Sequence, residues 1–485
     1  TLQPPDTVLL HMVALLFATS LLALPVGTVT LARGEKKSSL VHLKVLSEEQ
    51  AETWGARALD GSPYAYYASP SDASGPLDWI IYLEGGGECE TYQDCVQRIN
   101  DQGSSKKLKA TLDADKDVSD GMTIKDPAIN PDFYAFGTLF LPYLSGDDWA
   151  GQERRACVPW GDDQNCSGKG TTKKRPLFFC GHNNFEAAIA DWYASLVVKP
   201  RSVLLSGGSA GGQGAFFHAD RLAEILPAGT VVKANPQYGW FGAPTDTFPD
   251  WRKGAHTDPA KPYPSSGSPI AVPPWMFNIS LFVPKNCLAT LGPQDSPYLC
   301  TAYPRVALTV AVPLFVSTNL FDAWLTSVME QVPDGKLGPT KKADPKLAYM
   351  LGVTALSTRA TVRRAVPSNA SASRAAFVPE CFNHPMEWTH GSQAYRAPVL
   401  GARNCTHGAA VASWFFERGD CERVLIGEED RPTALSRMPC NNGLFNGSSF
   451  FTGVGHRLSA KQYAPHPGMA WIESLGRGIE QAFSQ

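Results

Sequence analysis

The sequence has almost no excess charge of either sign. Its 43 Lys and Arg residues against 46 Asp and Glu residues leave a net charge of -3. A protein that binds nucleic acid by neutralising phosphates needs a positive excess, so we expect no nucleic-acid partner. Internal repeats and low-complexity tracts are also missing. Apolar residues make up 43% of the chain and aromatic residues 10%, which excludes a disordered protein and indicates a globular one.

The eleven cysteines contain no CxxC pair and have no histidine neighbours at a zinc spacing. This pattern disfavours a zinc site and favours disulfides. Three close pairs are the candidates: Cys89/Cys95, Cys157/Cys166 and Cys287/Cys300. Because eleven is odd, at least one thiol stays unpaired or pairs with another molecule. The sequence predicts neither a metal ion nor a cofactor.

Only the stretch from Val8 to Leu31 is long and apolar enough for a membrane or a translocon. It predicts that residues 1–35 are a signal peptide or an uncleaved signal anchor, with a buried core helix as the third alternative. A membrane is a partner only in the anchor case. Five N-x-Ser/Thr sequons, which are candidate glycosylation sites, also favour a secreted or cell-wall protein. They are Asn165, Asn278, Asn369, Asn404 and Asn446.

Short apolar runs alternate with helical patterns, which is typical of βαβ units. The predicted strands are Trp79–Leu83, Phe136–Leu141, Ser202–Leu205, Thr230–Lys233 and Arg305–Val316. The predicted helices are Asn184–Leu196, Gly212–Leu226, Asp322–Gln331 and Met469–Phe483. We therefore expect an α/β domain at 36–485, with a mostly parallel central sheet and helices on both faces. Polar or Pro-rich stretches near 152–174 and 244–300 predict loop insertions.

The segment Gly207-Gly208-Ser209-Ala210-Gly211 matches G-x-S-x-G between a predicted strand and a predicted helix. This is the context of a nucleophile elbow, in which glycines on both sides let the serine occupy a strained turn. A glycine-rich phosphate loop and a plain tight turn are the alternatives. No Walker lysine follows, and no G-x-G-x-x-G pattern fits these glycines. The motif therefore predicts a nucleophilic Ser209, with the following helix directing its N-terminus toward an anion.

A serine nucleophile needs a general base, and the base needs an acid. The order serine, acid, histidine of α/β-hydrolases leaves five histidines open. They are His384, His390, His407, His456 and His466. Asp322 stands six residues beyond the apolar run at 305–316, where the carboxyl edge of a sheet is expected. A helix N-terminal Asp is the alternative interpretation of Asp322.

Three consecutive glycines, Gly85-Gly86-Gly87, follow the predicted strand at 79–83. Such a loop lets backbone N–H groups approach a substrate oxygen, as in the oxyanion loops of esterases. The N–H of Ala210 would be the second donor. Alone, a triple glycine is more often a plain turn. Together with the nucleophile elbow about 120 residues later, it indicates an oxyanion loop more specifically.

Several segments together resemble one family, the pectin acetylesterases and their animal relatives, the Notum-type carboxylesterases. The matching segments are residues 79–87, 103–106, 130–134, 204–212 with 218–220, 319–324 and 381–384. The resemblance implies an α/β-hydrolase-like fold and a serine carboxylesterase. It implies the triad Ser209, Asp322 and His384, and the oxyanion donors Gly86, Gly87 and Ala210.

The chain departs from the family at three places. Glu88 precedes Cys89 where plant members have tryptophan, and Pro385 follows the histidine where the family has an Asp or Cys. The segment 235–241 lacks the family's acidic residue. The tail beyond residue 400 matches no family feature that we can place.

The expected substrate is an acetylated polysaccharide such as pectin, or another acyl ester. Glu88, if it faces the pocket, would disfavour a long acyl chain because its carboxylate would have to be desolvated. A Notum-like hydrolase acting on a lipidated protein or lipid ester is the first alternative. A catalytically inactive extracellular binding module is the alternative of another class.

Overall fold

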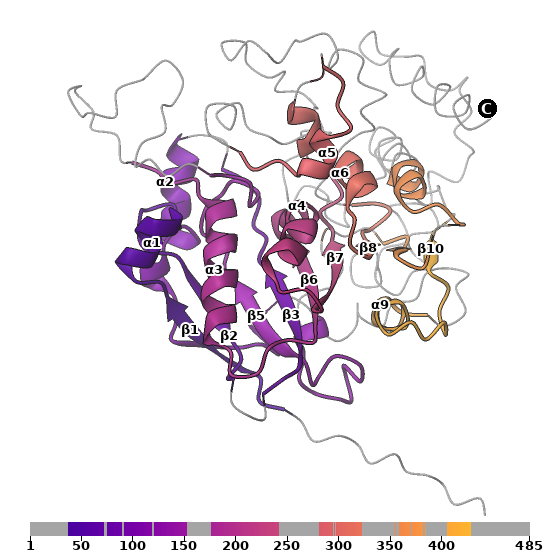
Figure 1. Cartoon of the computed structure of the whole chain (residues 1–485), viewed down its shortest axis with the longest axis horizontal. Coiled ribbons are helices and arrows are strands. Elements are labelled where there is room, and N and C mark those ends of the chain that lie inside the picture. Colours follow the sequence, from indigo (N-terminus) through magenta and orange to yellow (C-terminus); the bar gives the residue numbers. More distant parts are fainter. Residues whose placement is uncertain are drawn as a thin grey trace, which may run out of the picture. The chain divides into compact units, whose positions relative to one another are not determined.

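The computed structural model describes residues 37–71, 75–89, 92–118, 121–152, 176–241, 281–322, 355–381, 384 and 405–427. Within these ranges, residues 294, 296, 356, 357 and 370 are not described. These residues belong to one compact unit, Lys36–Gln485. At its centre lies a ten-stranded sheet with the strand order β10-β9-β8-β7-β6-β3-β5-β2-β1-β4 (Figure 1).

The strands are β1 (Leu40–Val45), β2 (Ala65–Ala68), β3 (Asp78–Leu83), β4 (Thr111–Asp113), β5 (Gly137–Leu141), β6 (Ser202–Gly208), β7 (Val231–Gln237), β8 (Leu314–Ser317), β9 (Arg374–Val378) and β10 (Val424–Ile426). The seven strands from β10 to β5 in the sheet order all run parallel to one another. Strands β2, β1 and β4 are added antiparallel at one end. The expected mostly parallel sheet is confirmed.

The described helices are α1 (Glu48–Trp54), α2 (Tyr92–Asp101), α3 (Gly181–Ser195), α4 (Ala210–Ile225), α5 (Lys285–Leu288), α6 (Tyr303–Thr309) and α9 (His407–Phe415). Short 3-10 turns are η1 (Ser105–Lys107), η2 (Gly121–Thr123) and η6 (Pro297–Thr301). The structure confirms the helices predicted at 184–196 and 212–226, each of which begins two or three residues earlier than expected.

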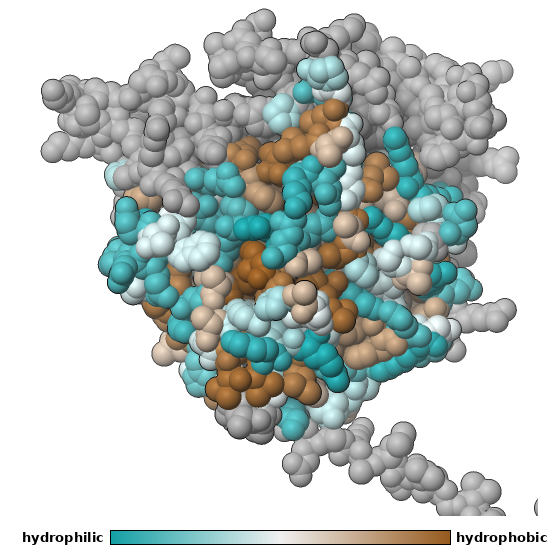
Figure 2. All heavy atoms as spheres, in the orientation of Figure 1, coloured by the Kyte–Doolittle hydropathy of each residue, from teal (hydrophilic) through white to brown (hydrophobic). Residues whose placement is uncertain are grey.

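The residues of β3 divide the core into its two layers. Trp79, Ile81 and Leu83 pack with α3, α4 and α6, whereas Ile80 and Tyr82 pack with α9 on the other face. Alternate residues point to opposite faces of a strand, so a strand buried on both faces is apolar throughout. Figure 1 shows α3 and α4 lying in front of the strands. Over this face, hydrophilic and hydrophobic side chains are intermixed (Figure 2).

The single strand predicted at 305–316 is wrong. Its first part is the helix α6, and only Leu314–Ser317 forms a strand, β8. The buried residues Tyr303, Val306, Ala307 and Val310 recur at helical spacing, and Pro304 occupies the first turn, where a missing N–H costs nothing. The run of β-branched residues concealed this period in the sequence.

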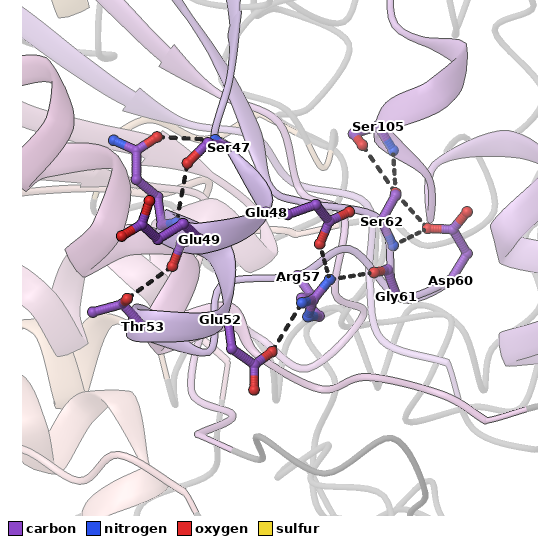
Figure 3. Close-up of polar contacts among 11 residues, drawn as sticks. Ser47, Glu48, Glu49, Glu52, Thr53, Arg57, Asp60, Gly61, Ser62 and Ser105 are labelled. Atoms are coloured by element: carbon purple, nitrogen blue, oxygen red, sulfur yellow. Dashed lines mark hydrogen bonds and ion pairs between the residues drawn. The ribbon is translucent and has the colours of Figure 1, made fainter.

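The corner before β2 is fixed by polar contacts (Figure 3). Helix α1 begins with a capping box in which the Ser47 hydroxyl accepts from Gln50 N–H at 3.1 Å and the Gln50 side chain accepts from Ser47 N–H at 2.9 Å. Arg57 donates to Glu48 at 3.1 Å and to the carbonyl of Gly61 at 3.0 Å. These bonds hold the turn at 60–62. That turn contacts residues 103–105, just after α2.

Three disulfides join described residues: Cys89–Cys95, Cys287–Cys300 and Cys405–Cys421. The first two were expected from their spacing and are confirmed. The third links α9 to the segment before β10 and was not singled out, because sequence does not determine connectivity. The candidate pair Cys157/Cys166 lies outside the described residues.

Several further expectations also fall outside the described part of the chain. They include the apolar segment 8–31, the insertion near 152–174, most of the region 244–300 and the helix at 469–483. The helix predicted at 322–331 is described only at its first residue. Within the described ranges, no helix is long and apolar enough to cross a membrane. Asn369 lies in an exposed turn, and the other four sequons are outside.

Two buried histidines predict an acid-sensitive fold. Burial, helped by the neighbouring His182, lowers the pKa of His218 to about 3, and burial lowers the pKa of His407 to about 4, from 6.5. The unfolded chain therefore binds more protons as the pH falls from 6.5 toward 4. For each of the two histidines, the free energy of unfolding should then fall by about 1.4 kcal/mol for each pH unit of acidification in this range.

Urea unfolding at pH 7 and pH 5 tests this expectation. Between these two pH values, His218→Gln should lose about 2 kcal/mol less stability than the wild type does. The exposed His42→Gln serves as the control and should behave as the wild type. Equal losses in the wild type and His218→Gln would contradict a neutral buried His218.

Candidate active site

Ser209 lies in a sharp turn between β6 and α4. Its backbone angles, φ 56° and ψ -124°, are strained for a residue with a side chain. The hydroxyl makes no capping hydrogen bond to α4, although serine usually does so at an N-cap. The Ser209 hydroxyl is therefore available to other partners.

The glycines around Ser209 are required by close packing. An added Cβ at Gly207 would collide with the backbone of Gly211, and one at Gly211 would collide with the carbonyl of Leu83. An added Cβ at Gly208 would collide with the Tyr238 hydroxyl. The collisions with strand and helix expected from the motif are thus present in the structure.

Ser209, Asp322 and His384 are brought together at the carboxyl edge of the sheet. They follow β6, β8 and β9, respectively, and the open end of parallel strands is where α/β enzymes place their ligands. His384 Nε2 lies 2.8 Å from Ser209 Oγ. His384 Nδ1 lies 3.0 Å from Asp322 Oδ2. At these distances the imidazole can take the proton of the serine hydroxyl, while the carboxylate orients the ring and can stabilise the imidazolium that forms.

The surroundings hold this arrangement in place. The Asp322 side chain is 3% exposed and that of His384 is 20% exposed. Asn319 Nδ2 donates to the backbone carbonyl of His384 at 3.2 Å, which ties the histidine segment to the end of β8. The ring of Phe241 lies 5.6 Å from the His384 ring. The acid and the base of this arrangement are therefore both largely shielded from solvent.

Of the other histidines that chain order left open, the structure describes His407. It is buried, and its Nε2 donates to Ser317 Oγ at 2.8 Å, while Ser317 donates to Asn235 at 2.7 Å. This pair is enclosed beneath α9 and does not reach Ser209. His390, His456 and His466 lie outside the described residues.

The glycine loop after β3 borders the same site. An added Cβ at Gly85 would lie 2.9 Å from the Ser209 Cβ. Gly86 and Gly87 have φ values of 141° and 64°, which glycine adopts readily. Ala210 is the first residue of α4, so its N–H is one of the free donors of a helix N-terminus. Their role as oxyanion donors stays a prediction.

A cavity of about 380 Å³ opens over Ser209. Two phenols and two carboxyl side chains line it, namely those of Tyr82, Tyr238, Glu84 and Asp117. The two hydroxyls lie 3.3 Å apart, and the Tyr238 ring meets the His384 ring edge-on at 5.3 Å. The segment 235–241 had been noted only as a departure from the family, and nothing in the sequence pointed to Asp117.

Among the described residues that line this cavity, the carboxyl groups are those of Glu84 and Asp117, not Glu88. The expectation that Glu88 would shape the pocket is therefore replaced by Glu84. Burial raises the pKa of Glu84, while a hydrogen bond from Tyr143 N–H at 2.8 Å opposes that effect. The cavity thus has carboxyl groups from other residues than the one expected, and Phe140 adds an apolar ring to the same lining.

A family model described as Pectinacetylesterase matches residues 35–432. The chain belongs to this family. The match extends beyond the segments that suggested the resemblance. It includes α9 and β10, so the family pattern continues to residue 432, into the region beyond residue 400 for which the sequence alone showed no family feature. These elements escaped notice because they are short and carry no chemical motif.

Relatives in this pectinacetylesterase family include pectin acetylesterase 11 from Arabidopsis thaliana, which is 29% identical over 78% of this chain and 88% of its own length. Palmitoleoyl-protein carboxylesterase Notum from Mus musculus is 25% identical over 54% of this chain and 47% of its own length. The chain is a carboxylic ester hydrolase, as these relatives are.

A solved structure supports the fold. The Wnt deacylase Notum from Drosophila superposes with a TM-score of 0.60, covering 81% of this chain and 97% of that chain at 20% identity. The expected α/β-hydrolase-like fold is confirmed.

Proposed function

We propose that this chain is a secreted serine carboxylesterase that removes acetyl groups from a polysaccharide such as pectin. The catalytic triad consists of Ser209, Asp322 and His384, and the oxyanion hole of the N–H groups of Gly86, Gly87 and Ala210. The 2.8 Å contact between His384 Nε2 and Ser209 Oγ carries the proposal. The disulfides support secretion, because such bonds persist in oxidising compartments.

The reaction proceeds in two half-reactions. Ser209 Oγ attacks the ester carbonyl carbon while His384 Nε2 takes its proton, and Asp322 stabilises the imidazolium that forms. The backbone N–H groups bind the negative oxygen of the tetrahedral intermediate. The C–O bond to the alcohol then breaks, and His384 returns the proton to the leaving oxygen. Water repeats the sequence on the acyl-serine and releases the acid.

The polar side chains of the cavity favour a small acyl group on a sugar. Tyr82, Tyr238 and Asp117 offer hydrogen-bond partners to sugar hydroxyls, because phenols both donate and accept and a carboxylate accepts. A long acyl chain gains about 0.8 kcal/mol per methylene only where an apolar wall receives it. Burying it against the exposed Asp117 would instead desolvate a carboxyl group.

An acyl-chain series on p-nitrophenyl esters, from acetate to palmitate, tests the substrate class. We expect kcat/KM to peak at acetate or butyrate, and acetylated pectin to release acetate. An apolar pocket would instead raise kcat/KM about fourfold for each added methylene. A steady rise to palmitate would replace the deacetylase proposal with a Notum-like hydrolase of fatty acyl esters.

A further inference from the structure

Two side chains at the end of α2 hold the backbone of the glycine loop at 84–87. Gln102 Nε2 donates to the carbonyl of Gly85 at 3.0 Å. Arg98 Nη1 donates to the carbonyl of Gly86 at 2.9 Å. Arg98 Nη2 also donates to Gln102 Oε1 at 3.1 Å, so the two side chains brace one another. Both carbonyls of the loop are therefore fixed on the side that faces α2.

Fixing a carbonyl also fixes the next N–H. The Gly85 carbonyl and the Gly86 N–H share one trans peptide unit and point in opposite directions. The same holds for the Gly86 carbonyl and the Gly87 N–H. With the carbonyls held toward α2, the two N–H groups are turned to the opposite side of the loop. The cavity that the loop shares with Ser209 borders these residues.

A loop of glycines needs such external restraint. Glycine has no Cβ to limit rotation, so a peptide unit between two glycines can turn over at little cost. An added Cβ at Gly86 would collide with Gln102 Oε1. The glycine that gives the loop its freedom therefore also gives Gln102 the space to restrain it.

The end of α2 is itself fixed by contacts with two other segments. The segment 103–105, which follows Gln102, is bonded to the turn at 60–62: Ser105 Oγ donates to Ser62 Oγ at 2.9 Å (Figure 3). On the other side, the Cys89–Cys95 disulfide ties the end of the glycine loop to α2. Gln102 is thus a fixed point rather than a mobile surface side chain.

We propose that Gln102 and Arg98 are positioning residues that orient the N–H groups of Gly86 and Gly87 toward the oxyanion. This inference rests on the proposed function. Arg98 adds a second effect, since its positive charge polarises the Gly86 carbonyl and makes the Gly87 N–H a stronger donor. Neither side chain contacts the substrate carbonyl, so both act through the backbone.

Gln102→Leu tests the proposal, because it removes the bonds to Gly85 and Arg98, together with the hydrogen bond between Gln102 and Glu84. We expect kcat on p-nitrophenyl acetate to fall about 10- to 100-fold, less than the loss of a whole oxyanion donor, while KM stays within about twofold. Affinity for phenylboronic acid, whose tetrahedral serine adduct places an oxygen in the oxyanion hole, should fall by the same factor. Gln97→Leu, the same change on the exposed side of α2, should retain wild-type kcat.

Gln102→Glu is the second variant and decides the matter if Gln102→Leu does not fold. It keeps the size of the side chain and the bond from Arg98 but has no donor for the Gly85 carbonyl at neutral pH. A wild-type kcat in Gln102→Glu would overturn the proposal, as would a raised KM with unchanged kcat. If Ser209→Ala remains active, the proposed function fails. If Ser209→Ala is inactive and the Gln102 variants match the wild type, only the positioning role fails.

Discussion

Ser209→Ala is expected to lower kcat at least about 10⁴-fold while the protein stays folded, because the oxyanion donors that remain cannot supply a nucleophile. The strain at φ 56° also persists in alanine, so the backbone gains no relief from the change. Turnover of p-nitrophenyl acetate measures the loss. Phenylmethylsulfonyl fluoride should modify the wild type at the peptide containing Ser209 and leave Ser209→Ala unmodified.

Ser206→Ala is the matched control in the same strand. Ser206 Oγ donates to the Asn235 carbonyl and accepts from Gln237 Nε2, both at 3.0 Å within the core. Its loss should therefore cost about 2 to 3 kcal/mol of stability and leave kcat within about twofold. Loss of turnover in Ser206→Ala with activity retained in Ser209→Ala would reverse the assignment of the elbow. If neither variant loses activity, the active centre must lie elsewhere in the fold.

Asp322→Asn and His384→Ala should each lower kcat by about three to four orders of magnitude. Asparagine cannot stabilise the imidazolium as a carboxylate does, and alanine removes the base. The two residues act on one proton through the 3.0 Å contact, so the double variant should be little slower than either single variant. A double-mutant cycle on kcat measures this coupling.

His42→Ala, on the exposed side of β1, is the control for loss of an imidazole and should keep wild-type kcat. Losses that multiply in the double variant would show that Asp322 and His384 act independently. In that case Asp322 would be better explained as a structural residue at the end of β8.

The parallel centre of the fold could be predicted, and its surroundings could not. Strands β3, β5 and β6 each contain an unbroken run of buried apolar residues, because both faces of each are covered, whereas β7 is apolar mainly at its start. Strand β1 reads Leu-Val-His-Leu-Lys-Val and is half exposed, so its weak pattern did not distinguish it from a loop. Strands β9 and β10 are short and depend on tertiary pairing for their existence.

The candidate site likewise has residues that the sequence indicates and residues that it does not. Ser209 is evident from the residues because the elbow needs glycines at fixed offsets. His384 could be selected only through the resemblance, since chain order left five histidines open and loop conformation decides which one reaches the serine. Tyr238, Asp117 and Gln102 have no motif. Gln102 bonds to Gly85, 17 positions away, and Tyr238 to Tyr82, 156 positions away, and sequence spacing carries no signal for such contacts.

The two strands that end the described sheet, β4 and β10, have only three residues each. A long, flat edge strand presents unpaired N–H and C=O groups onto which a second chain can add. Here the backbone available for such pairing is brief at both ends, and Asp113 with Lys116 places charge beside β4. Within the described residues, the sheet therefore offers little edge backbone onto which a second chain could add, which lowers its tendency to grow into intermolecular aggregates.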